Sequence, residues 1–231
     1  MKLLAVETAT EACSAALWID GEVTECFQLA PREHTQLILP MIDGLMANAG
    51  LRPQQLDALA FGCGPGSFTG VRIATGVVHG IAFGADLPIV PVSTLAAIAQ
   101  DYFDNHTGDI ALTAMDARMG EIFWGVYQRN LLGFAELWAK ERVCPAQEVA
   151  LPQATGVGVG SAWAVYQADL KQRLGILLSH SLTGSAWPRA GAVVKLGAEG
   201  ARLGKAVPVE LAMPVYLRDK VAQKESERKK L

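Results

Sequence analysis

The segment between residues 56 and 84 constrains the fold more than any other part of the chain. An apolar run, Leu56–Phe61, leads into the turn Gly62-Cys63-Gly64-Pro65-Gly66-Ser67, and a long apolar stretch continues to about Gly84. Glycine and proline in such density interrupt regular structure, so the pattern predicts a strand, a tight turn and a helix. Ser67 and Thr69 are both suited to cap that helix. The segment therefore predicts a protein of the α/β class.

Three strands and a helix are expected before this segment. Apolar stretches separated by polar turns predict strands over Leu3–Thr8, Cys13–Ile19 and Glu22–Leu29. Apolar residues then recur every three to four positions between Leu37 and Ala49, which is the period of one helical face. Pro40 lies inside this pattern, so the regular helix either starts near Leu39 or is kinked at the proline.

The second half of the chain repeats this organisation. After an apolar run, Pro88–Val92, and a helical segment, Ser93–Gln100, the polar stretch 101–109 marks a boundary. Beyond it we expect strands over 110–115, 121–128 and 156–160 and helices over 161–174 and 191–203. These patterns predict an N-terminal lobe over residues 1–102 and a smaller C-terminal lobe over 103–231. The last segment, Arg218–Leu231, is expected to be a helix that frays into a charged tail.

Composition places the chain among folded globular proteins. Hydrophobic residues make up 51% of 231 positions and charged residues 19%, which is enough apolar surface for a substantial core. The formal net charge of −3 argues against a surface devoted to neutralising phosphates, although a local basic patch is compatible with it. The scattered residues Cys13, Cys26, Cys63 and Cys144 form no CxxC pair, so neither a disulfide framework nor a zinc ribbon is expected.

Targeting signals are not evident in the sequence. Glu7 and Glu11 interrupt the apolar N-terminal run before it reaches the length of a signal peptide. The apolar stretch Val71–Ala85 contains Arg72 and His79 and is shorter than a bilayer requires. We therefore expect a soluble, cytoplasmic protein with no membrane partner.

A search for catalytic motifs gives little. The Gly-rich turn precedes a helix N-terminus, where backbone N–H groups favour anions, but it is neither a Walker A loop nor a GxGxxG fingerprint. A phosphate contact and a tight packing turn therefore both fit it. Asp116, Arg118 and Glu121 surround one turn and suit either a polar ligand or a local hydrogen-bond network. The four histidines, His34, His79, His106 and His180, have no metal-ligand spacing, and no nucleophile arrangement or GxSxG elbow is recognisable.

Three glycines mark one stripe of the helix that follows the Gly-rich turn. Gly76, Gly80 and Gly84 are spaced four residues apart, and each glycine costs a helix about 1 kcal/mol relative to alanine. The stripe therefore predicts that another helix backbone comes close, either from this chain or from a partner. The apolar face between Leu37 and Met46 poses the same question, because a core face and an association face have the same periodicity.

Six segments together resemble the bacterial TsaB (YeaZ) family. They run in order from end to end of the chain, and GPGSFTGVR is the most specific of them. The segments are Leu4-Ala5-Val6-Glu7-Thr8-Ala9-Thr10-Glu11-Ala12-Cys13-Ser14, Pro31-Arg32-Glu33-His34-Thr35-Gln36, Gly64-Pro65-Gly66-Ser67-Phe68-Thr69-Gly70-Val71-Arg72, Pro91-Val92-Ser93-Thr94-Leu95, Asp116-Ala117-Arg118 and Pro214-Val215-Tyr216-Leu217-Arg218.

The resemblance implies a two-lobed, actin-like ATPase (ribonuclease H-like) fold of the actin, sugar-kinase and heat-shock-protein superfamily, with a mixed sheet and helices in each lobe. It also implies a non-catalytic scaffold and activator subunit in tRNA threonylcarbamoyladenosine modification. Members of the family assist the paralogous transferase TsaD, together with the ATPase TsaE, in modifying the adenosine next to the anticodon. The implied partners are thus TsaD, TsaE and, through the complex, tRNA, with a homodimer when the chain is alone.

The resemblance also implies the lack of catalytic residues and of a metal. In TsaD two histidines four positions apart hold a metal, and the matching positions here are Thr94 and Ile98. Isoleucine has no lone pair to donate, so that metal site does not form. The turn Glu7-Thr8-Ala9-Thr10 lacks the aspartate and glycine of the sugar-kinase phosphate turn, which argues against ATP hydrolysis by this chain alone.

Two sets of binding residues follow from the resemblance. Partner binding is expected on the first two long helices, through His34, Leu37, Ile38, Met41, Ile42, Leu45, Arg72, Ile73, Gly76, Val77 and Gly80. No cofactor is intrinsic to the chain, but ATP or ADP with Mg is implied at the interface with TsaD, through Thr8, Thr10, Gly64, Gly66, Ser67 and Arg118.

Two other functions compete with the scaffold. A free-standing ATPase or small-molecule kinase of the same fold would require metal-dependent phosphate binding at residues 8–10 and 64–67. A peptidase, a label given to the wider family, lacks a recognisable nucleophile or metal-ligand pair in this sequence.

Overall fold

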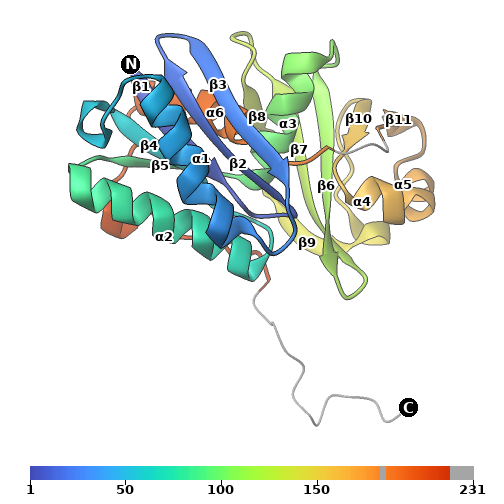
Figure 1. Cartoon of the computed structure of the whole chain (residues 1–231). Helices are drawn as coiled ribbons and strands as arrows, with labels where there is room; N and C mark the ends of the chain where they lie inside the picture. The colour runs from blue at the N-terminus through green and yellow to red at the C-terminus, as the bar shows by residue number, and fades with distance from the viewer. Residues whose placement is uncertain (183–185, 219–231) are drawn as a thin grey trace, which may run out of the picture.

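Two lobes lie side by side in the computed structural model, which describes residues 1–182 and 186–218 (Figure 1). Each lobe is built on its own sheet, one of five strands and one of six, and helices pack on both sheets. The predicted two-lobed α/β class, with a mixed sheet and helices in each lobe, is therefore confirmed. The segment predicted as a fraying C-terminal helix lies outside the described residues from residue 219 on.

The first sheet has the strand order β3-β2-β1-β4-β5. Strands β1 to β3 are antiparallel neighbours, whereas β4 and β5 run parallel to β1, as the change from strands to alternating strands and helices predicts. The strands are β1 (Lys2–Glu7), β2 (Ala12–Ile19), β3 (Glu22–Leu29), β4 (Ala58–Gly62) and β5 (Ile89–Val92).

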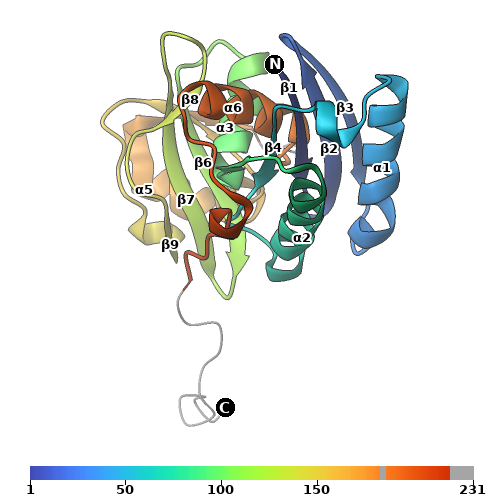
Figure 2. The same ribbon diagram turned by 90° about the vertical axis from the view of Figure 1, so that its left-hand side faces the viewer.

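Helices cover both faces of this sheet, because the side chains of β1 alternate. Leu4 and Val6 pack under α1 (His34–Asn48) and α2 (Phe68–Ala85). Leu3 and Ala5 pack on the opposite face with α6 (Ala190–Arg202). Figure 2 shows α1 and α2 on one side of the first sheet and α6 on the other.

The second sheet has the order β11-β10-β6-β7-β8, with β9 pairing to β7. The helix α3 (Thr94–Asn105) packs on one face, and α4 (Ala162–Val165) and α5 (Gln167–Leu174) pack on the other. The strands are β6 (Ile110–Arg118), β7 (Glu121–Arg129), β8 (Ala135–Leu137), β9 (Arg142–Pro145), β10 (Gly156–Val159) and β11 (Leu178–Ser181), and the short helices of the chain are η1 (Pro53–Gln55), η2 (Ala146–Glu148), η3 (Gly175–Leu177) and η4 (Val209–Leu211).

The helix α6 belongs to a different lobe from the one expected when the chain is divided after residue 102. Although it lies in the second half of the chain, it packs on the first sheet and contacts α3. Two glycines permit this close approach: an added Cβ would lie 2.5 Å from Ala60 Cβ at Gly197 and 2.7 Å from Val90 Cγ1 at Gly200. The C-terminal half thus supplies a layer of the N-terminal lobe.

Several predicted boundaries differ from the structure. The first helix starts at His34 and keeps Pro40 inside it, so the predicted start near Leu39 was wrong. The proline is exposed, which leaves the carbonyl that lost its partner open to water. The polar stretch after residue 100 is partly helical, since α3 ends at Asn105. The helix expected over residues 161–174 is divided at Tyr166, and β8, β9 and β11 were not predicted.

One helix within the described ranges, α2, is long and apolar enough to cross a membrane by length and composition alone. The expectation that this stretch is too short was therefore wrong, because the helix begins at Phe68 rather than near Val71. Only 33% of its 18-residue window is buried, through side chains that pack on the first sheet.

Candidate functional site

A cleft of about 840 Å³ lies between the two lobes, and we call it the interlobe cleft. The first lobe contributes the turn between β1 and β2 and the N-terminus of α2, and the second contributes the β6–β7 hairpin. Aromatic side chains line it beside arginines, namely Phe68, Phe123, Trp187 and Tyr216 with Arg32, Arg118 and Arg218. Of the residues predicted for a nucleotide, Thr10, Gly66, Ser67 and Arg118 line this cleft.

The two other predicted nucleotide residues lie behind the wall of the cleft. Thr8 is fully buried, and its Oγ1 donates a hydrogen bond to the Gly70 carbonyl at 2.7 Å. Gly64 faces the carbonyl of Val215, which an added Cβ would approach to 2.7 Å. Both residues serve the packing of the turn and do not line the cleft, so their contact with a ligand stays a prediction.

The Gly-rich turn packs tightly on the turn that follows β1. An added Cβ at Gly66 would lie 2.5 Å from the Ala9 carbonyl oxygen, and one at Gly70 would lie 2.1 Å from that of Thr8. The Ser67 N–H donates to the Ala9 carbonyl at 2.7 Å, and Ser67 Oγ caps α2 by accepting from the Gly70 N–H at 3.3 Å. The packing-turn alternative is thus confirmed, and a phosphate contact at the same turn stays a prediction.

Arginine–carboxylate ion pairs line the second lobe's side of the cleft. Arg118 contacts Asp116 at 3.1 Å and reaches across the cleft to Glu11 at 3.6 Å. Arg218 contacts Glu121 at 2.6 Å. The local network predicted for this turn is therefore present, and Arg118 has a side chain that is 75% exposed. An incoming anion would compete with carboxylates already in place.

A buried carboxyl group lies directly beneath the Gly-rich turn. Glu7 is fully buried, its Oε1 accepts from the Ala9 N–H at 2.6 Å, and its Oε2 has no hydrogen-bond partner within the described residues. Burial raises the pKa of Glu7 to about 7. Gly62 leaves the space for this group, since an added Cβ would lie 1.8 Å from Oε2. An acidic residue ending a strand that is otherwise apolar was the available sequence signal.

The positions that correspond to the metal ligands of TsaD do not suit a metal here. Thr94 Oγ1 is buried without a partner in the described part of the chain, and Ile98 packs in the core between α3 and the second sheet. Across residues 1–182 and 186–218, no group of three His, Cys, Asp or Glu side chains could hold a metal ion. The donor set at Thr94 and Ile98 offers one hydroxyl and no nitrogen.

Much of the predicted partner face on α1 is the core face of that helix. His34 is 8% exposed, and its Nε2 contacts the Thr10 carbonyl at 2.8 Å. The other buried members are Ile38, Met41, Ile42 and Leu45, which pack on the first sheet. A docking role for these five side chains was therefore wrong, because the chain itself covers them.

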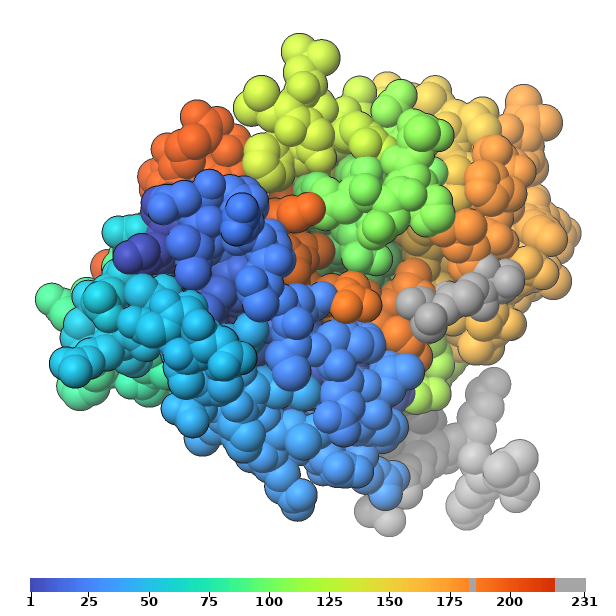
Figure 3. Space-filling view, turned by 45° about the horizontal axis from the view of Figure 1, so that its top comes forward, coloured from blue at the N-terminus to red at the C-terminus, as the bar shows by residue number. Residues whose placement is uncertain are grey.

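The remaining predicted residues are accessible and lie mainly on α2. Leu37, Ile73 and Val77 are half-buried, and Arg72, Gly76 and Gly80 are exposed. An added Cβ at Gly76, Gly80 or Gly84 would meet nothing within 4 Å, so no helix among residues 1–182 and 186–218 approaches the stripe. Within those residues the structure contradicts the intramolecular explanation of the stripe. Figure 1 shows α1 and α2 next to each other, and the space-filling view in Figure 3 shows the first lobe's outer surface beside α1.

Buried nucleophiles outside the cleft have structural partners. The hydroxyls of Ser93 and Tyr127 both donate to Glu141, and Ser93 Oγ caps α3 by accepting from the Leu95 N–H at 3.1 Å. Burial raises the pKa of Glu141 and brings that of the Cys63 thiol to about 12. Sequence analysis did not single out Glu141, which lies in an irregular loop. These groups connect elements rather than form an activated nucleophile.

Comparisons with known proteins agree on one family. The family model described as "TsaD: tRNA N6-adenosine threonylcarbamoyltransferase" matches residues 28–226. The chain is 43% identical to the tRNA threonylcarbamoyladenosine biosynthesis protein TsaB of Escherichia coli over 97% of both chains. It is 42% identical to that of Haemophilus influenzae over 97% of this chain and 96% of the relative. A solved structure, YeaZ from Pseudomonas aeruginosa, is 39% identical with a TM-score of 0.87 and covers 94% of this chain and 99% of its own.

Proposed function

Because this chain belongs to the TsaB (YeaZ) family of tRNA threonylcarbamoyladenosine biosynthesis proteins, we propose that it is the non-catalytic scaffold that binds and activates TsaD. Its role in tRNA threonylcarbamoyladenosine biosynthesis follows from the family. The finer assignment, with TsaE as the further partner, tRNA bound through the complex and a cytoplasmic location, is our proposal.

The outward-facing glycine stripe of α2 carries this proposal. Helical glycines are costly, and no atom of residues 1–182 and 186–218 occupies the space that a Cβ at Gly76, Gly80 or Gly84 would need. A helix from a partner could approach the α2 backbone there, with Ile73 and Val77 of α2 and Leu37 of α1 beside it. The same surface would pair two copies of the chain when TsaD is absent.

The cleft supports a nucleotide role only as part of the complex. Thr10, Gly66, Ser67 and Arg118 line one continuous surface, and aromatic side chains beside them suit a base. Thr8 and Gly64 would act by holding this surface in place. Since Asp116 and Glu11 already contact Arg118, we propose that ATP or ADP with Mg binds there together with groups supplied by TsaD.

The test is light scattering after size exclusion of the chain alone, of its mixture with TsaD, and of the Gly80→Leu variant. We expect a heavier complex that this variant loses, because a bulky side chain on the stripe costs roughly 1–3 kcal/mol where relaxation is possible, and more where it is not. Ala168→Leu, an equally exposed helical position on α5, is the matched control and should bind TsaD normally. A Gly80→Leu variant that folds and binds unchanged contradicts the docking surface.

The same preparations test the alternatives. ATP turnover by the purified chain without TsaD would favour the free-standing ATPase or kinase. Cleavage of casein that a chelator or a serine reagent abolishes would favour a peptidase. If no complex with TsaD forms with or without nucleotide, the scaffold function itself is wrong.

A further inference from the structure

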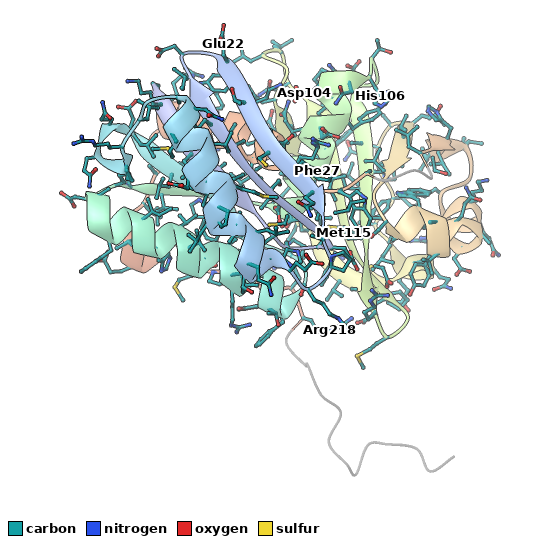
Figure 4. All side chains as sticks on the ribbon, in the orientation of Figure 1. Glu22, Phe27, Asp104, His106, Met115 and Arg218 are labelled. Atoms are coloured by element: carbon teal, nitrogen blue, oxygen red, sulfur yellow. The ribbon has the colours of Figure 1, made fainter. Side chains whose placement is uncertain are left out.

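Residues 213–218, which we call the C-terminal strap, run across the interlobe cleft. The strap follows η4 beneath α2 and ends beside the β6–β7 hairpin of the other lobe, and Val215, Tyr216, Leu217 and Arg218 all line the cleft. Figure 4 shows Arg218 at its far end, below Met115 and between the two lobes. A covalent segment of the chain thus connects the lobes where the cleft opens.

Backbone hydrogen bonds fasten one end of the strap to the first lobe. The Val215 N–H donates to the Cys63 carbonyl, within the Gly-rich turn, at 2.7 Å. Gly64 makes room for this contact, because an added Cβ would lie 2.7 Å from the Val215 oxygen. Just before the strap, His79 Nε2 on α2 contacts the Ala212 carbonyl at 2.7 Å.

The last two side chains of the strap, Leu217 and Arg218, fasten its other end to the second lobe. Arg218 donates to Glu121 Oε2 at 2.6 Å and to the Arg118 carbonyl at 3.2 Å. The side chains of Arg218 and Glu121 are 20% and 34% exposed, so water and salt reach this pair. Leu217 adds a contact with the core of the second lobe.

The hairpin that Arg218 holds has an unusual backbone. Arg118 and Met119 have φ values of 63° and 58°, a region that non-glycine residues rarely adopt. The bond from Arg218 to the Arg118 carbonyl supports this conformation, and the Arg118 side chain in turn reaches Glu11 of the first lobe at 3.6 Å. Loss of the Arg218 contact therefore affects both connections between the lobes at the cleft.

We propose that the C-terminal strap is a latch that holds the interlobe cleft closed, with the Arg218–Glu121 ion pair as its releasable end. The Val215 end is a short backbone bond in a packed turn, whereas the Arg218 end combines a partly exposed ion pair with a bond to the Arg118 carbonyl and the packing of Leu217. Loss of the ion pair weakens the hold of the strap on the second lobe, lets the hairpin relax and widens the cleft to ligand from that side.

Amide hydrogen exchange at Val215 tests the latch without any ligand or partner. In Glu121→Gln we expect this amide to exchange about tenfold faster than in the unaltered chain, because the acceptor for Arg218 at the other end of the strap becomes a neutral amide oxygen and the ion pair is lost. Leu59, whose N–H donates to the Pro88 carbonyl at 2.9 Å in the first lobe, reports global stability and should exchange unchanged. Glu199→Gln is the matched control, since it removes another ion pair of 2.6 Å, to Arg202, far from the strap.

A second variant keeps the test decisive. Arg218→Gln should accelerate exchange at Val215 at least as much as Glu121→Gln, because it also removes the bond to the Arg118 carbonyl, and the double variant should exchange no faster than Arg218→Gln alone. Added salt should accelerate exchange at Val215 in the unaltered chain only. Equal exchange at Val215 in all variants overturns the latch, and so does faster exchange that Leu59 shares, which would mean general destabilisation.

Discussion

Individual residues around the Gly-rich turn show how packing and chemistry are combined in this chain. Gly62, Gly64, Gly66 and Gly70 all face atoms that leave no room for a Cβ, and the group beneath Gly62 is the carboxyl of Glu7. Spacing alone predicted that the turn is tight, but it could not separate residues that line a cleft from those behind it. That distinction depends on Ala9 and Val215, which belong to distant parts of the sequence.

Glu7 makes the stability of the chain depend on pH. Burial raises its pKa from 4.5 to about 7, so the folded state binds this proton more tightly than the unfolded state does. The resulting stabilisation is complete below pH 4.5 and is lost as the pH rises to about 7, a change of about 3 kcal/mol. Glu7→Gln should remove this loss. The free energy of unfolding of the variant should therefore rise relative to that of the unaltered chain between about pH 5 and about pH 8.

Urea unfolding at those two pH values measures the effect, with the exposed Glu22→Gln as the control. If the free energy of unfolding changes with pH in the same way in the unaltered chain and in Glu7→Gln, the prediction is wrong and the Glu7 carboxyl stays ionised in the folded protein.

At the scale of elements, periodicity predicted the helices but not whether each apolar or glycine-lined face is buried in the core or lies on the surface. The apolar stripe of α1 fits a core and an association surface equally, and only its position on the first sheet shows that Ile38 and Leu45 are covered. The glycine stripe of α2 gave the opposite result, because no described residue packs against Gly76, Gly80 or Gly84. The strands β9 and β11 were missed because they pair with strands about twenty residues away, which no local pattern contains. The strand β8 forms a hairpin with β7 but has only three residues, too few for an alternating pattern.

The cap of α2 gives a prediction for one element. Ser67 Oγ accepts from the Gly70 N–H, whereas Thr69, the other candidate, lies inside the helix. Ser67→Ala should therefore lower the free energy of unfolding by about 1 kcal/mol, and Thr69→Ala should leave it nearly unchanged. Thermal or urea unfolding of both variants decides this, and an equal loss in the two would mean that the cap contributes nothing specific.

At the scale of the whole molecule, the sequence predicted two lobes but not which segments of the chain belong to each lobe. The return of α6 to the first sheet brings Ala190 and Val193 against Leu3 and Ala60. Arg189, just before α6, contacts Glu25 of β3 at 2.6 Å. Such contacts join residues more than a hundred positions apart, and a boundary drawn from composition at residues 101–109 cannot contain them. The lobes are consequently coupled through α6, α3 and the C-terminal strap.

The charged tail belongs to this scale because its effect depends on the assembled complex. Truncation after Val221 removes Lys224, Arg228, Lys229 and Lys230, which we expect to approach phosphates when the complex holds tRNA. Each lost phosphate contact should reduce the slope of log affinity against log salt by about 0.7–0.9, so the loss of all four contacts reduces it by about 3 to 4. A full-length variant with glutamine at these four positions separates charge from length and should match the truncation. If both variants keep the slope of the unaltered complex, the four basic residues of the tail do not contact tRNA phosphates, and those contacts come from elsewhere in the complex.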